Sequence, residues 1–257
     1  MLAQSVEQPG AWVNEFDLEI IQSRFWFVGQ FLFDCDVVEF GAATSLGKNV
    51  ILNKARTYCG IEIVPENAKK LEDFLGDRGK ILNEDCCFTS LDAECCDIVL
   101  ALAMVYYVDL GSMLKEAHRI LRPGGRLLFC SPNSEQPFFR PAPGSKNYHS
   151  IEEVLQHAQV NGFLAQAYCS YEFSVPSSTR LGLFKNRLSV LFRKISPFLI
   201  EKHPIFYKSI KQLTRGKMKK IPEELDFEAN FEQPRSVNRC VSLNYKMFYY
   251  DLRKTDE

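Results

Sequence analysis

Residues 37–45 read VVEFGAATS, and this stretch decides the fold that the rest of the chain has to satisfy. Two β-branched residues lead into an acid, and Gly41 then begins a run of small residues. In βαβ units that bind nucleotides, glycines stand at every second position of such a turn, because the backbone must approach the ligand closely. Here Gly41 is the only glycine of the three, and Ala43 and Ser45 hold the other two positions. The remaining sequence has to show whether the turn still holds a ligand.

Apolar runs alternate with helical patterns on both sides of this turn. They predict strands at 36–40, 57–63, 80–83, 97–102, 126–130, 163–173 and 240–250, and helices at 45–55, 66–76 and 111–121. Short strands that are apolar on both faces and alternate with helices indicate a parallel sheet covered on both sides. We therefore expect an α/β fold, a Rossmann-like, mostly parallel sheet of seven strands, with ligands bound beyond the carboxyl ends of its strands.

Capping signals predict two further helices around this core. Asn14 precedes a segment with acids in its first turn, which is typical of a helix over 14–30. Ser150 and Glu153 form the S-x-x-E capping box of a helix that ends at Val160, before Asn161 and a glycine. We expect a core over 1–175, an inserted helical cap over 176–236 and a last strand within 237–257 that completes the core.

Composition favours a globular, cytoplasmic protein. Hydrophobic residues make up 46% of the 257 residues, and no uninterrupted apolar run reaches the length of a membrane span. The first residues, MLAQSVEQPG, lack the basic start and apolar core of a secretory signal. Nine cysteines are present, but the adjacent pairs at 86–87 and 95–96 lack the C-x-x-C spacing of a metal site. We expect reduced cysteines and no metal.

Four motifs follow one another at ordered spacings. They are EFGAATS at 39–45, GIEI at 60–63, NEDC at 83–86, and CDIVLA at 96–101 followed by HRILRPGGRLLF at 118–129. Together they resemble the class I S-adenosylmethionine-dependent methyltransferases, specifically the type-11 methyltransferase group, over about residues 35–175. A dehydrogenase would share the first two motifs, but not the R-x-L-R-P-G-G-x-L phrase.

The resemblance implies S-adenosylmethionine as cofactor and assigns roles to three acids. Glu39 would meet the methionyl amine and Asp85 the adenine amino group. Glu62 ends the second strand about 20 residues after the turn, where nucleotide folds place the acid that binds the ribose diol. The cofactor residues expected from the resemblance are Glu39, Gly41, Ala42, Ala43, Thr44, Glu62, Ile63, Asp85, Cys86 and Ala101.

Methyl transfer from a sulfonium is an in-line displacement, for which the protein supplies alignment and a dry pocket. A base is needed only if the acceptor arrives protonated with a high pKa. His149 follows the loop after the fifth strand and is the candidate base, with a capping or loop role as the alternative. Tyr106 and Tyr107 follow the fourth strand at the expected pocket rim, where packing is the alternative. The expected reaction methylates an O or N atom of a small molecule in natural-product or glycan biosynthesis.

The basic segment 176–220 leaves three interpretations open. It carries 12 Lys and Arg against 1 acid, a net charge of +11 in a chain whose total is −1. Basic and apolar residues alternate in it with amphipathic spacing: Arg180, Lys185, Arg187, Arg193 and Lys194 with Leu181, Phe184, Leu188, Phe192 and Ile195. It would form a cap with a solvated basic face, recognise an anionic acceptor, or dock on an anionic membrane surface. Nucleic acid is disfavoured because the overall pI is about 6.5.

The missing glycines also motivate a second function class, a catalytically silent scaffold or binding protein with a methyltransferase fold. Retention of Glu62, Asp85 and the Pro-Gly-Gly phrase in one chain favours the enzyme.

Overall fold

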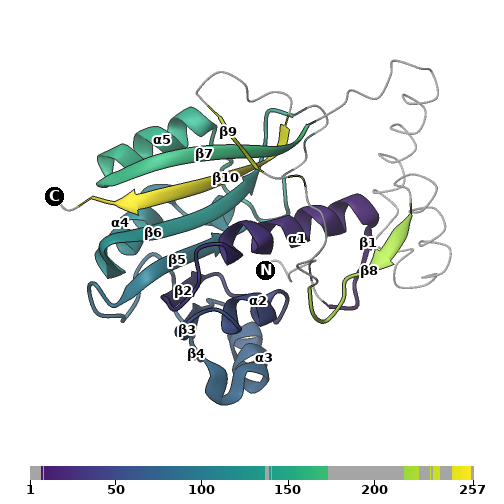
Figure 1. Cartoon of the computed structure of the whole chain (residues 1–257), viewed down its shortest axis with the longest axis horizontal. Helices are drawn as coiled ribbons and strands as arrows, with labels where there is room; N and C mark the ends of the chain where they lie inside the picture. The colour runs from purple at the N-terminus through teal and green to yellow at the C-terminus, as the bar shows by residue number, and fades with distance from the viewer. Residues whose placement is uncertain are drawn as a thin grey trace.

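In the computed structural model, an eight-stranded sheet forms the centre of the molecule (Figure 1). The structure describes residues 7, 9–136, 139, 141–172, 217–225, 232, 234–237 and 245–255. In spatial order the sheet contains β4 (Lys80–Leu82), β3 (Thr57–Ile61), β2 (Asp36–Phe40), β5 (Cys96–Leu102), β6 (Leu121–Pro132), β10 (Tyr245–Lys254), β7 (Phe163–Glu172) and β9 (Arg235–Ser236). The pairs from β4 to β6 are parallel, and β10 runs antiparallel between β6 and β7. The expected Rossmann-like α/β fold is confirmed.

The strand count differs from the expected seven because short pairings are added. The two-residue β9 pairs with the outer side of β7, and β1 (Trp12–Asn14) forms a separate pair with β8 (Met218–Lys220). The last strand of the core continues beyond its predicted end at residue 250 to Lys254. Asp251 and Arg253 made this end look polar, but the Asp251 carboxylate pairs with Arg126 of the adjacent strand β6.

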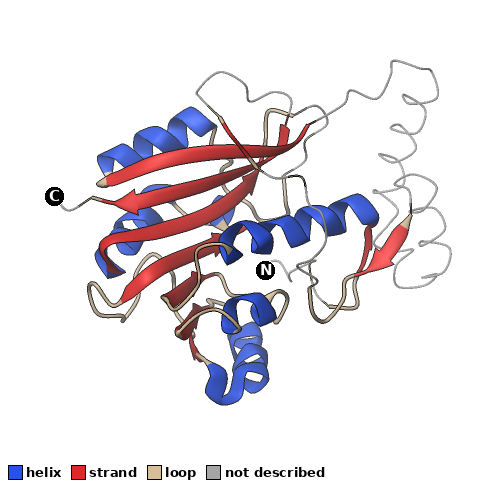
Figure 2. Cartoon of the chain, viewed as in Figure 1, coloured by secondary structure: helices blue, strands red, loops and turns tan. Residues whose placement is uncertain are grey.

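Helices cover both faces of the sheet (Figure 2). Helices α1 (Glu15–Gly29), α2 (Lys48–Leu52) and α3 (Pro65–Leu75) share one apolar cluster with the sheet, and α4 (Leu110–Ile120) and α5 (Ile151–Val160) share the other. Alternate residues of one strand enter opposite clusters: Leu127 and Phe129 face α4, whereas Leu128 faces α1. Strands buried on both faces account for the continuous apolar runs in the sequence.

The predicted helix boundaries are confirmed where a side chain caps the helix. The Asn14 side chain accepts a hydrogen bond from the Asp17 N–H at 2.7 Å and begins α1. Ser150 and Glu153 form the predicted capping box of α5. Helix α2 is shorter than the predicted 45–55, because Gly47 takes a left-handed conformation with φ +72° just before it. An added Cβ at Gly47 would lie 2.3 Å from the Phe25 ring, so glycine is required there.

The predicted cap over 176–236 falls largely outside the described residues. This includes the alternating basic and apolar residues from Arg180 to Ile195, so their three interpretations stay open. Within the segment, residues 217–225 are described, and they place β8 beside β1 at the start of α1. None of the helices in the described part of the chain is long and apolar enough to cross a membrane.

A charge network joins three strands at the amino edge of the sheet, opposite the carboxyl ends. Arg122, from the R-P-G-G phrase, donates to Asp36 at 2.9 Å and to Asp97 at 2.7 Å. Arg56 donates to the same two carboxylates, at 2.7 and 3.1 Å. The Arg56 guanidinium, and after it Thr57 and Arg122, hold the pKa of the Asp36 carboxyl well below its ordinary value. The phrase therefore fastens β6 to β2 and β5.

Replacing Arg122 by Met should lower the free energy of unfolding at neutral pH by about 1 kcal/mol, because the arginine is partly solvated. A carboxyl whose pKa is depressed by folding contributes stability above its ordinary pKa and loses it on acidification. The difference between wild type and variant should therefore shrink once the pH falls below 3.8, the ordinary pKa of Asp36. Urea unfolding at neutral pH and below pH 3.8 measures this difference in the free energy of unfolding. Arg78→Met, at an exposed position, is the control. A difference that stays constant on acidification would contradict this role.

Candidate functional site

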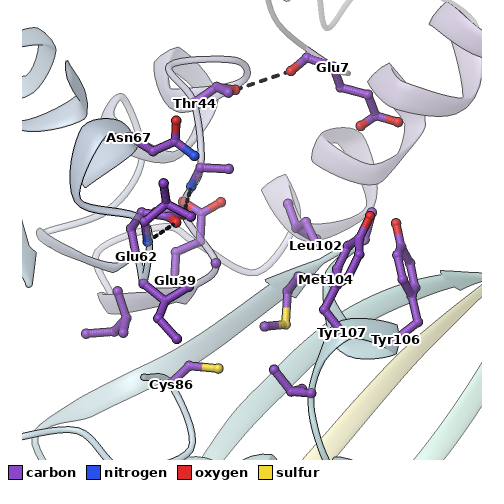
Figure 3. Close-up of a pocket in the computed structure, with 18 of the residues that line it drawn as sticks. Glu7, Glu39, Thr44, Glu62, Asn67, Cys86, Leu102, Met104, Tyr106 and Tyr107 are labelled. Atoms are coloured by element: carbon purple, nitrogen blue, oxygen red, sulfur yellow. Dashed lines mark hydrogen bonds between the residues drawn. The ribbon is translucent and has the colours of Figure 1, made fainter. Parts of the chain in front are cut away.

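A cavity of about 730 Å³ lies beyond the carboxyl ends of β2, β3 and β5. Figure 3 shows Glu39 and Glu62 on one side of it and Tyr106 and Tyr107 on the other. The expected residues that line it are Glu39, Gly41, Ala42, Ala43, Thr44, Glu62, Ile63, Asp85, Cys86, Tyr106 and Tyr107. The fold therefore gathers the ends of separate motifs around one space, as parallel sheets do.

The turn after β2 keeps a glycine-like backbone without the usual glycines. Gly41 has φ +67°, and a Cβ there would lie 3.0 Å from the Met104 side chain. Ala43, at the second glycine position of the family pattern, takes φ +45°. An L-residue in this left-handed region costs about 1–2 kcal/mol. The turn is thus retained in shape, with strain at Ala43.

The Glu62 carboxylate holds this turn in place. One carboxylate oxygen accepts the Ala43 N–H at 2.8 Å, and the other accepts the Val64 N–H, also at 2.8 Å. The Asn83 side chain donates to the Glu62 carbonyl at 2.7 Å and fixes the strand end. Each carboxylate oxygen has two lone pairs, so one acceptor position per oxygen remains. Two such positions on one buried carboxylate fit the two hydroxyls of a ribose.

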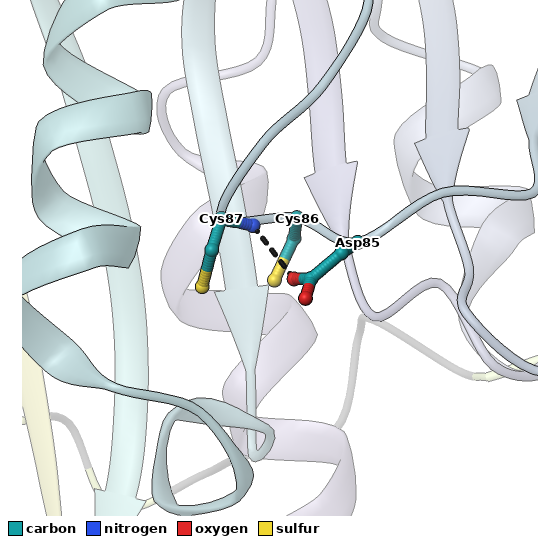
Figure 4. Close-up of side chains that lie close together, drawn as sticks. All are labelled: Asp85, Cys86 and Cys87. Carbon is teal, nitrogen blue, oxygen red and sulfur yellow. Dashed lines mark hydrogen bonds between the residues drawn. The ribbon is translucent and has the colours of Figure 1, made fainter.

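Asp85 lies in the loop after β4 beside two cysteines (Figure 4). One Asp85 carboxylate oxygen accepts the Cys87 N–H at 2.9 Å, and the exposed carboxylate has further lone pairs that an amino group could use. The two sulfur atoms and a carboxylate oxygen lie within 4.8 Å of one another, which brings together three atoms of metal-ligand type. A hydrogen bond from Cys86 lowers the pKa of the Cys87 thiol, while the same bond and burial raise that of Cys86.

Glu39 is held by groups of the chain itself. The buried Lys48 ammonium lies 3.0 and 2.9 Å from the two Glu39 oxygens, and the Tyr58 hydroxyl donates to one of them at 2.6 Å. The ammonium also donates to the Ala42 carbonyl at 3.1 Å. Burial, and after it the Glu39 charge, raise the pKa of Tyr58 well above its ordinary value, so this hydroxyl stays a donor. The negative charge of Glu39 is therefore neutralised inside the protein.

An arginine enters the cavity from α1. Arg24 is 9% exposed, and its guanidinium lies 2.6 Å from the Glu7 carboxylate. The hydroxyls of Tyr106 and Tyr107 point toward Glu7 on the same side of the cavity (Figure 3). Burial raises the pKa of both tyrosines, so their hydroxyls are protonated at neutral pH. This side of the cavity therefore offers hydrogen-bond donors and a cation.

Two expected residues lie outside the cavity lining. Ala101 is fully buried within β5, and its successors Leu102, Ala103 and Met104 line the space instead. His149 precedes α5, where its imidazole lies 4.0 Å from the Glu153 carboxylate and its ring centroid 5.8 Å from that of His157. Burial lowers the pKa of His149. This surrounding matches the loop and capping alternative for the histidine.

Residues 38–129 match the family model described as a methyltransferase domain. Among solved structures, an S-adenosylmethionine-dependent methyltransferase of Thermotoga maritima shares 16% identity at a TM-score of 0.55, with 93% of this chain and 92% of that chain covered. An S-adenosylmethionine-dependent methyltransferase of Archaeoglobus fulgidus shares 14% identity at a TM-score of 0.54, with 93% of this chain and 94% of that chain covered. The [4+2]-cyclase SpnF shares 13% identity at a TM-score of 0.56, with 98% of this chain and 88% of that chain covered. At these identities the similarity shows the fold. A comparison with curated proteins found no match.

Fold and site define a Rossmann-like protein in which the Glu62 carboxylate, directly after β3, presents acceptor positions to the cavity. The match over residues 38–129 and the fold support assigning the chain to the class I S-adenosylmethionine-dependent methyltransferases. The donors and acceptors at Glu62 and Asp85 fit the adenosine part of S-adenosylmethionine, the cofactor of this class. Glu39 does not offer the methionyl amine an uncompensated charge.

Sequence reasoning missed three charged residues of the site: Glu7, Arg24 and Lys48. Arg24 is the single basic residue in the stretch LEIIQSRFWFVG, and a lone basic residue in a largely apolar helix is a signal that could have been used. Lys48 begins a short helix, where a lysine is ordinarily solvated, so its burial had no signal in the sequence.

Replacing Glu62 by Ala should weaken S-adenosylhomocysteine binding by at least about 30-fold, because two hydrogen bonds to a buried carboxylate are lost and the turn loses its anchor. Calorimetric titration measures the affinity. Glu72→Ala is the control, since Glu72 is exposed on α3 and does not line the cavity. Equal effects of the two changes would show that Glu62 has no special part in binding.

Replacing Ala43 by Gly should raise the free energy of unfolding by up to about 1 kcal/mol, because relief of left-handed strain exceeds the added chain entropy. Thermal or urea unfolding measures the change. Ala42→Gly at the adjoining position should instead destabilise, since Ala42 is buried and has no positive φ. Destabilisation by both substitutions would contradict strain at Ala43.

Proposed function

We propose that this enzyme transfers the methyl group of S-adenosylmethionine to an O or N atom of a small-molecule acceptor by in-line displacement. The observation that carries the proposal is the two-sided cavity. The acids that suit the adenosine lie on one side, and Tyr106 and Tyr107 lie across the space from them (Figure 3). A cavity open between a bound donor and hydroxyl groups that orient an acceptor is what a displacement reaction requires.

The chemistry of the lining favours an acceptor that is already nucleophilic. No histidine lines the cavity within the described residues. Tyr106 stays protonated because burial raises its pKa, so it donates a hydrogen bond and does not accept a proton. An unprotonated amine or an acidic hydroxyl needs no base in the displacement step. The roles proposed for Tyr106 and Tyr107 are to orient such an acceptor.

The walls of the cavity suit a largely apolar acceptor with a negatively charged substituent. Phe25, Leu102, Met104 and Val108 contribute apolar surface that keeps water out. Lys146 also lines the cavity, and its backbone N–H donates to the Tyr106 carbonyl at 2.7 Å, which fixes it beside the tyrosines. A lysine at this rim supports a carboxylate-bearing acceptor, such as an acidic natural product or glycan.

Incubation with deuteromethyl cofactor and a panel of amines and hydroxyl compounds, each with and without a carboxylate, tests the proposal. We expect acceptor-dependent formation of S-adenosylhomocysteine and a deuteromethylated product by mass spectrometry, with carboxylate-bearing members preferred by about tenfold. Glu62→Ala serves as the control that lacks bound donor. Tight cofactor binding without transfer to any member would favour the silent binding protein.

A further inference from the structure

Asp85, Cys86 and Cys87 bring two thiols and a carboxylate together beside the cavity (Figure 4). One ligand atom from each residue lies within 4.8 Å of the other two. Cys86 and Cys87 are 6% and 7% exposed, whereas Asp85 is exposed. In the described part of the chain, no other three histidine, cysteine or acidic side chains approach one another this closely. The cluster therefore combines two sheltered sulfur atoms with an oxygen that solvent can reach.

A turn explains how two adjacent cysteines can face the same point. Neighbouring side chains of a strand point to opposite faces, so an adjacent pair within a strand could not share an ion. Here the pair follows β4, and the Phe88 N–H donates to the Asp85 carbonyl at 3.0 Å. The Cys87 N–H donates to the Asp85 carboxylate at 2.9 Å and holds it beside the sulfur atoms. The turn thus supplies the convergence that a C-x-x-C spacing provides elsewhere.

The donor set suits a thiophilic divalent cation. Thiolates favour zinc and similar soft ions, whereas magnesium and calcium take oxygen ligands. In a tetrahedral site with zinc–sulfur bonds of about 2.3 Å, the two sulfur atoms lie about 3.8 Å apart. Ligand atoms within 4.8 Å of one another need to move by about 1 Å at most to reach this geometry. Three protein ligands leave the fourth coordination position open to water.

The cluster shares two residues with the cavity. Asp85 and Cys86 both line it, close to Glu62 and Ile63, whereas Cys87 does not. The family resemblance gives the Asp85 carboxylate to the adenine amino group of the cofactor. A cation on that carboxylate would use its lone pairs and present a positive charge to an approaching N–H donor. Adenine and the cation therefore compete for one carboxylate.

We propose that Asp85, Cys86 and Cys87 bind a thiophilic divalent cation of the zinc and cadmium type, and that this cation excludes the adenosyl part of the cofactor. A chain that holds the cation loses cofactor affinity, and bound cofactor protects the thiols by the same factor, because coupling between two ligands is reciprocal. The exclusion rests on the cofactor assigned to this cavity, whereas the cation site stands on the cluster alone.

Cadmium titration of the reduced wild-type chain, followed by sulfur-to-cadmium charge-transfer absorption, tests the site. We expect one tightly bound cation per chain. Cys87→Ser should weaken its binding by at least about 100-fold, because even the partners of metal ligands contribute about 10- to 100-fold. Cys95→Ser is the matched control, since Cys95 also belongs to an adjacent cysteine pair, to which the described residues add no third ligand. Equal losses in the two variants, or binding that survives in Cys87→Ser, overturn the proposal.

Asp85→Asn tests the third ligand and keeps both thiols. It should weaken cadmium binding by at least about tenfold and retain the charge-transfer absorption of the bound form. This variant decides the matter if Cys87→Ser does not fold, and an unchanged cadmium affinity in it overturns the proposal.

Calorimetric titration of S-adenosylhomocysteine with and without saturating zinc tests the exclusion. Zinc should weaken binding by at least about tenfold in wild type and leave it unchanged in Cys87→Ser, which keeps the backbone N–H that holds Asp85. Chelation of zinc by the ligand itself would affect both proteins alike. A wild-type affinity that zinc does not change overturns the exclusion. Absence of S-adenosylhomocysteine binding in every protein overturns the cofactor assignment, while the cadmium titration still decides the cation site.

Discussion

The contact between the Glu62 carboxylate and the Ala43 N–H is the interaction on which the site depends. It joins the ends of two adjacent parallel strands and fixes the turn in which Ala43 takes a glycine conformation. The hydrogen bond offsets part of the strain, and the strain is retained because the N–H must face the carboxylate. The glycines of the family pattern adopt this backbone conformation without strain. In this chain the hydrogen bond from Ala43 to the buried Glu62 carboxylate holds the turn in that conformation.

The amino ends and the carboxyl ends of the strands have different functions. At the amino edge, Arg56 and Arg122 tie Asp36 and Asp97 together and fasten three strands. At the carboxyl edge, the same strands end in turns whose polar groups face a cavity. Because the strands are fixed at their amino ends, they hold the loops at their carboxyl ends in place. The loops can therefore contact a ligand without first becoming ordered. The Pro-Gly-Gly phrase that identifies the class in the sequence thus acts at the amino edge, away from the chemistry.

Much of the fold follows from the sequence because its signals are local. The strand over 36–40, the cap at Asn14 and the capping box at Ser150 are read from neighbouring residues and lie where they were predicted. The site is harder because burial of a charge depends on distant partners. Lys48 is buried only since Glu39 turns toward it across nine residues, and Arg24 reaches the cavity only through the packing of α1 on the sheet. Neither the pairing of Lys48 with Glu39 nor the packing that brings Arg24 to the cavity can be recognised from neighbouring residues in the sequence.

Each buried charge of the site is paired with an opposite charge from the chain itself. A charge in a low-dielectric wall needs a counter-charge at all times, with or without ligand. Lys48 gives Glu39 a permanent counter-charge within the core, whereas Glu7 gives Arg24 one from a half-exposed position. The permanent pair stabilises the turn, because Lys48 binds both Glu39 and the Ala42 carbonyl. The half-exposed pair keeps the Arg24 charge compensated in the wall of the cavity. Loss of two glycines from the turn therefore does not by itself remove the site, because both charged pairs still line the same cavity.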